Sequence, residues 1–70
     1  MKLRVLIEKD EDGVYVAQVP SLPGCISQGK TRADALRNIE DAISGYIASL
    51  KKRKEPIPPS IIEEVVDISA

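Results

Sequence analysis

Residues 19–25 read Val-Pro-Ser-Leu-Pro-Gly-Cys, and this stretch separates parts of the chain that have different hydrophobic patterns. Pro20 and Pro23 end the strand pattern before them, because proline has no N–H to donate to a β-ladder. Gly24 permits a sharp re-entry, because glycine adopts positive φ at little steric cost. We expect an architectural turn here before a binding site, with the apolar Leu22 tucked into the end of the core. The turn residues singled out by the sequence are Pro20, Leu22, Pro23 and Gly24.

The chain before this turn has the pattern of a β-hairpin. Residues 2–9 alternate as in a strand, with Leu6 on one face and three apolar residues on the other, which are Leu3, Val5 and Ile7. Residues 10–13 read Asp-Glu-Asp-Gly, and the Asp-Gly pair supplies the positive φ that tight hairpin turns need. Residues 14–19 are rich in β-branched and aromatic residues, which predicts the second strand.

The register of these two strands is left open by the sequence. A loop of even length would put Val14 and Val16 beside Ile7. A bulged loop would instead put there the alternating set of Tyr15, Ala17 and Val19. Leu6 points to the opposite face, where one of these sets must join it in an apolar patch. The candidate interface residues are Leu6, Tyr15, Ala17 and Val19.

An amphipathic helix is predicted after a short third strand over residues 25–29. Thr31 is a good N-cap, and Asp34 stands at the third helical position, close to a capping-box arrangement. The helix runs over about residues 32–53, with apolar residues at spacings of three and four. They are Ala35, Leu36, Ile39, Ala42, Ile43, Tyr46, Ile47 and Leu50. Residues 51–54 are all basic, and we interpret them as solvated cations that complement the helix macrodipole.

The end of the chain predicts one more strand. Pro56, Pro58 and Pro59 stop the helix and form a stiff connector. Residues 61–68 are rich in Ile and Val and are expected to form the last strand, although a short helical turn could occupy its first residues. A crossover through a helix is typical of a parallel return to the sheet. We therefore expect one α+β domain over residues 1–70, with a four-stranded sheet of order 3-2-1-4 and the helix on one face.

The composition argues against several classes of function. Ten basic and eleven acidic residues nearly balance, and there is no Phe or Trp, which argues against direct nucleic-acid binding. Because histidine is absent and Cys25 is the only cysteine, we expect no catalytic site, no metal site and no cofactor. Cys25 is interpreted as a small apolar filler. No apolar run approaches the roughly 20 residues that span a membrane, so we expect a cytoplasmic protein.

The stretch from residue 10 to residue 31 resembles the HicB antitoxin family, also described as the UPF0150 group. The resemblance rests on the acidic turn before Gly13, on Tyr15, on residues 19–25, and on residues 29–31, which open the helix. It implies a truncated RNase H-like βββαβ fold. It also implies a partner, the small toxin HicA, which has a dsRBD-like fold and cleaves mRNA with the help of a histidine. In this family the antitoxin binds the toxin and covers its active site.

An RNase H-like fold raises the question of a nuclease site, which needs several carboxylates around two divalent cations. Glu8, Glu40 and Glu64 could form one such set of carboxylates, but the centre of the first strand holds no acidic residue. We therefore expect these carboxylates to be solvated and the protein not to be an enzyme.

Two functions remain for a protein of this kind. The first is an antitoxin-like protein that binds and neutralises a HicA-type mRNA interferase toxin. The alternative is a homo-oligomeric structural or regulatory module with no toxin partner. One helix covers only one face of a sheet, so we also expect a homodimer that buries the open face or a sheet edge.

Overall fold

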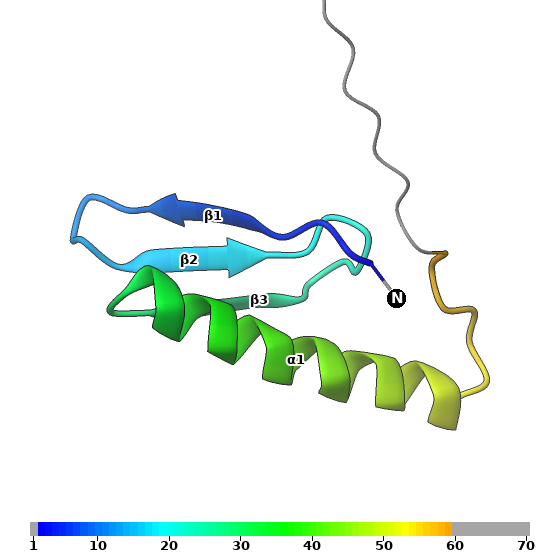
Figure 1. The fold of residues 1–70 in the computed structure, drawn as a ribbon. Helices are drawn as coiled ribbons and strands as arrows, with labels where there is room; N and C mark the ends of the chain where they lie inside the picture. Colours follow the sequence, from blue (N-terminus) through cyan, green and yellow to red (C-terminus); the bar gives the residue numbers. More distant parts are fainter. Residues whose placement is uncertain (1, 60–70) are drawn as a thin grey trace, which may run out of the picture.

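Three antiparallel strands and one long helix form two layers in the computed structural model, which describes residues 2–59 (Figure 1). In chain order the elements are β1 (Leu6–Lys9), β2 (Tyr15–Gln18), β3 (Ile26–Gly29) and α1 (Arg32–Lys52). The strand order is β1-β2-β3, and α1 packs against β3 and β2 on one face of the sheet. The α+β class and the helix on one face are confirmed. The fourth strand expected over residues 61–68 lies outside the described residues.

The turn between β1 and β2 decides the register of the hairpin. The N–H of Asp10 donates to the carbonyl oxygen of Val14 at 2.8 Å, and the N–H of Gly13 donates to the carbonyl oxygen of Asp10 at 3.1 Å. Gly13 has a φ of 83°. The Asp10 Oδ1 atom accepts from the N–H groups of Asp12 and Val14, both at 2.9 Å. This is a three-residue loop with glycine in the left-handed region, which corresponds to the bulged alternative.

The resulting register places Ile7 opposite Ala17 and Ala17 opposite Ser27. Directly opposed residues share a face, so Ala17 lies on the same face as Ile7. This face carries the core, because Ala17 is completely buried under the helix. The even-length loop, which would have put Val14 and Val16 beside Ile7, is excluded.

The helix is held to the sheet by its apolar stripe and by its start. The Thr31 Oγ1 atom accepts from the N–H of Asp34 at 3.0 Å, as expected for an N-cap. Asn38 Nδ2 donates to the carbonyl oxygen of Gln28 in β3 at 2.7 Å. The stripe predicted from the sequence is confirmed as the buried or half-buried side of α1, with Ala35, Ile39 and Leu50 in the core. Within residues 2–59, no helix is long and apolar enough to cross a membrane.

The end of α1 has a lysine where helices usually have glycine. The N–H of Glu55 donates to the carbonyl oxygen of Leu50 at 2.9 Å, and that of Lys54 donates to Lys51 at 3.1 Å. This pair of bonds is the Schellman motif, in which the residue after the cap adopts a left-handed conformation. Lys54 occupies that position with a φ of 57°. A side chain in this conformation has a steric cost of about 1–2 kcal/mol relative to glycine.

Replacing Lys54 with glycine is therefore expected to stabilise the protein by about 1 kcal/mol, because it relieves this conformation. Thermal unfolding followed by circular dichroism measures the effect. Lys52→Gly is the matched control, since it removes the same side chain from the last helical residue of α1. It should lower stability by about 0.5–1 kcal/mol. Equal shifts of the two variants in the same direction would contradict the backbone explanation.

Candidate binding surface

Two consecutive β-turns connect β2 to β3. The N–H of Leu22 donates to the carbonyl oxygen of Val19 at 3.0 Å, and the N–H of Cys25 donates to that of Leu22 at 2.9 Å. The N–H of Val19 donates to the carbonyl oxygen of Cys25 at 3.1 Å and closes the loop. Pro23 and Gly24 occupy the central positions of the second turn, where glycine must adopt positive φ, and the φ of Gly24 is 81°.

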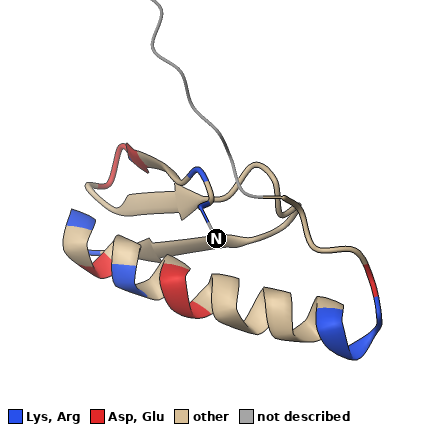
Figure 2. Cartoon of the chain, turned by 45° about the vertical axis from the view of Figure 1, so that its right-hand side comes forward, with Lys and Arg blue, Asp and Glu red and all other residues tan. Residues whose placement is uncertain are grey.

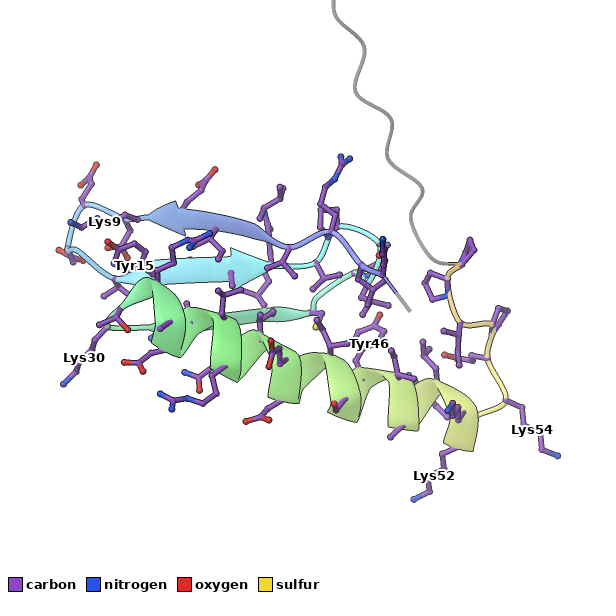
Figure 3. The ribbon with its side chains drawn as sticks, in the orientation of Figure 1. Lys9, Tyr15, Lys30, Tyr46, Lys52 and Lys54 are labelled. Atoms are coloured by element: carbon purple, nitrogen blue, oxygen red, sulfur yellow. The ribbon has the colours of Figure 1, made fainter. Side chains whose placement is uncertain are left out.

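This double turn has a buried side and an exposed side. Leu22 is only 1% exposed, so its predicted place in the core is confirmed. The Tyr46 hydroxyl donates to the carbonyl oxygen of Pro23 at 2.9 Å, which fastens the turn to the middle of α1 (Figure 3). Pro20, Pro23 and Gly24 remain exposed. The turn therefore presents a rigid outer surface whose position is set by Leu22 and by α1.

Cys25 lies at the end of the same turn. The residue is 4% exposed, and burial raises the pKa of its thiol above the usual value. A raised pKa leaves little thiolate at neutral pH, and the thiolate is the reactive form. This environment agrees with the interpretation of Cys25 as an apolar filler.

The sheet face that α1 does not cover carries two exposed apolar residues. Leu6 and Ile26 are the large hydrophobic residues that stay exposed among residues 2–59, at 42% and 58%. Leu6 is opposite Gln18, and Gln18 is opposite Ile26, so the three form one row across the sheet. Val16 is half-buried and lies in the next row. We call the surface formed by Leu6, Val16, Gln18 and Ile26 the open face.

Three of the four candidate interface residues lie on the face that α1 covers and not beside Leu6. Ala17 and Val19 are buried in the core at 0% and 2% exposure, and Tyr15 is half-buried against it. The bulged turn at Gly13 sets the parity that turns these residues toward the helix. Only Leu6 lies on the open face. Ile26 was not among the predicted residues, although the alternation of the third strand could have indicated it.

The described carboxylates considered for a nuclease site, Glu8 and Glu40, do not lie close together. Glu8 lies on the open face, because its partner Val16 does. Glu40 is an exposed residue of α1, which covers the opposite face of the sheet. Glu64 lies outside the described residues. Within residues 2–59, no group of three or more acidic, cysteine or histidine side chains is placed to hold a metal ion.

Acidic residues gather at the hairpin tip, and a run of basic residues ends α1 (Figure 2). The acidic residues of the turn at 10–12 lie at the hairpin tip, and the basic residues 51–54 lie at the far end of α1. Lys52 and Lys54 point away from the body of the protein (Figure 3). At the hairpin end, the Lys9 Nζ atom lies 5.7 Å from the centre of the Tyr15 ring, a cation–π distance.

Comparisons with known proteins connect these features to a family. The chain is 58% identical to a UPF0150 protein of Thermoplasma acidophilum over 65 residues, which are 93% of this chain and 94% of that protein. It is 47% identical to a UPF0150 protein of Archaeoglobus fulgidus over 55 residues, 79% of this chain and 78% of the relative.

A solved structure is similar over most of the chain. The N-terminal domain of the Burkholderia pseudomallei antitoxin HicB superposes with a TM-score of 0.79 and 32% identity, covering 90% of this chain and 74% of that one. Residues 3–69 match the profile of a family described as "HicB_like antitoxin of bacterial toxin-antitoxin system". The profile match, the UPF0150 relatives and the similar fold agree, and this chain belongs to the HicB-like antitoxin family.

Proposed function

We propose that this protein is an antitoxin that binds a small HicA-type mRNA interferase and neutralises it by covering its active site. The observation that carries the proposal is the likeness to the N-terminal domain of an antitoxin HicB, at a TM-score of 0.79 over 90% of the chain. The family match over residues 3–69 supports the same role.

The proposed mechanism is binding without catalysis, without a cofactor and without direct contact to nucleic acid. Glu8 and Glu40 lie on opposite sides of the sheet, which does not favour shared metal ions. The pKa of Cys25 is raised by burial, which does not favour a nucleophile. We place the protein in the cytoplasm, because the mRNA that such a toxin cleaves is found there.

We also propose that residues 61–68 complete a truncated RNase H-like sheet as a strand parallel to β1, in the order 3-2-1-4. β1 is an edge of the described sheet, and α1 packs mainly over β2 and β3. Val5 and Ile7 are only half-buried against the core, which leaves apolar surface at this edge. Ile57 of the connector packs on the same core, so the chain turns back toward the core after α1.

The proposed function is tested with the product of the neighbouring reading frame, expected to be a small basic protein with a histidine. Purified toxin should cleave RNA, and an equimolar amount of this protein should stop the cleavage and co-elute with the toxin. As a control, the protein alone is incubated with RNA and with an RNA–DNA hybrid in Mg²⁺ and in Mn²⁺, and we expect no cleavage. Undiminished cleavage without a complex would refute the antitoxin proposal.

The second candidate is a homo-oligomeric structural or regulatory module with no toxin partner. The exposed apolar residues of the open face favour it, because small monomers rarely leave such patches in water. The two candidates differ in what co-purifies with the protein. An antitoxin is recovered with a second small chain after co-expression, whereas a self-sufficient module is recovered only with copies of itself.

A further inference from the structure

The open face carries an ordered charge pattern along the first strand. Exposure alternates from residue 2 to residue 8, so the even-numbered side chains continue the face that Leu6 and Glu8 define. Along the first strand, Lys2 and Arg4 are exposed at the end nearest the N-terminus. Glu8 is exposed at the end nearest the hairpin. Leu6 therefore lies between basic side chains on one side and an acidic side chain on the other.

This pattern is complementary to itself when the strand direction is reversed. Consider a two-fold axis that lies between two open faces, runs across the strands and passes at Leu6. It lays β1 of one copy antiparallel over β1 of a second copy, so that Leu6 meets Leu6. Glu8 and Arg4 are each two residues from Leu6, so Glu8 of each copy meets Arg4 of the other. A two-fold axis that is parallel to the strands and runs over β2 would instead place Glu8 over the neutral Gln28.

The same axis also aligns the apolar residues of β2 and β3. Ile26 lies in the row of Leu6, so Ile26 of one copy lies over Ile26 of the second. Val16 lies one row nearer the hairpin than Gln18, and therefore faces the position one row beyond Gln18 in the second copy. β2 ends at Gln18, so this position lies beyond the strand, beside the turn that begins at Val19. Apolar residues thus meet apolar residues at Leu6 and at Ile26, and Gln18 meets Gln18 between them.

We propose that two copies of this protein bind through their open faces in this two-fold, strand-reversed arrangement, with Leu6 facing Leu6 and Glu8 beside Arg4 of the other copy. The face is built from three strands of four residues each, which is small for an interface. We expect a dissociation constant on the order of micromolar. The dimer requires no toxin, so this proposal and the antitoxin proposal succeed or fail separately.

The first test replaces Leu6 with lysine and measures mass by light scattering coupled to size exclusion at about 100 μM. The wild type should be a dimer of the 7.6 kDa chain. Leu6→Lys should raise the dissociation constant by about a hundredfold, because both copies lose the apolar contact on the two-fold axis and gain facing charges. Ala48→Lys, on the exposed side of α1, is the control and should leave the dimer intact.

Circular dichroism shows whether the variant is folded, and Leu6→Lys should retain the helix signal of the wild type. A wild type that is monomeric at this concentration would overturn the proposal. So would a Leu6→Lys variant that folds and remains as dimeric as Ala48→Lys. A loss of toxin binding without any change of mass would assign the open face to the toxin instead.

The second test is a charge exchange that only the strand-reversed arrangement allows. Glu8→Arg and Arg4→Glu should each weaken the dimer by roughly tenfold, because each change creates two like-charge contacts per dimer. The double variant Glu8→Arg/Arg4→Glu should restore the wild-type dissociation constant. An equimolar mixture of the two single variants should also dimerise as tightly as the wild type, since its contacts are again between opposite charges. Failure of both rescues would exclude the Glu8–Arg4 contact and overturn the arrangement.

Discussion

Leu22→Ala is expected to destabilise the protein by about 3 kcal/mol and to lower its melting temperature by roughly 15 °C. Leu22 is 1% exposed, and its backbone is held by both turns of the connection between β2 and β3. The removed methyl groups leave a cavity that the turn closes poorly, because Pro20 and Pro23 make its backbone stiff. For a small domain of ordinary marginal stability, this loss is a large part of the total.

Thermal and urea unfolding followed by circular dichroism measure this effect. Leu6→Ala is the matched control, since it makes the same chemical change at a residue that is 42% exposed, and it should cost much less. The measurement is made at low concentration, where self-association does not contribute. If Leu22→Ala melts like the wild type but no longer binds the toxin, Leu22 is an anchor for the partner and its role in the core is refuted.

Gly29→Ala is expected to cost about 2–3 kcal/mol for a different reason, namely overpacking. A Cβ atom at Gly29 would lie 2.5 Å from the Ala35 nitrogen and 2.7 Å from two atoms of Asp34, one of them backbone. These contacts are shorter than any that folded proteins accept, and the first turn of α1 would have to move. Gly29 therefore allows the end of β3 to approach the start of the helix closely.

Gly45→Ala is the control for this prediction and should have the opposite sign. A Cβ atom at Gly45 would meet no atom within 4 Å, and the residue lies inside α1. Alanine in a helix interior is more stable than glycine by about 0.5–1 kcal/mol. Thermal melting of the two variants side by side should therefore show shifts in opposite directions. A Gly29→Ala protein as stable as the wild type would contradict this prediction, because the start of α1 could then move away from β3 without a loss of stability.

Much of the fold follows from local patterns in the sequence. The helix is confirmed over Arg32–Lys52 because its apolar spacing and the Thr31 cap are both local signals. The burial of Leu22 is confirmed because an apolar residue between two prolines in a turn has few other places to go. The first strand is shorter than expected and begins at Leu6, since β2 ends at Gln18 and offers no partner beyond it.

The candidate surface was harder to predict than the fold, because it depends on the parity of one turn. Both faces of β2 carry apolar residues, so hydrophobicity alone does not decide whether Val16 or Ala17 faces the helix. The deciding contacts are the Asp10 carboxylate on the N–H groups of the turn and the positive φ of Gly13. A sequence of Asp-x-x-Gly between two strands is a signal for this bulged loop, and it could have resolved the ambiguity.

The hairpin turn also limits how the length of this protein can vary. Deleting a single residue between positions 10 and 14 would shift the parity of β2 by one. Gln18 would then point into the core and Ala17 would be exposed to water, which exchanges the inside and the outside of the strand. Adding or removing two residues preserves the parity. Among relatives that keep this core, insertions and deletions in the first loop should therefore come in pairs.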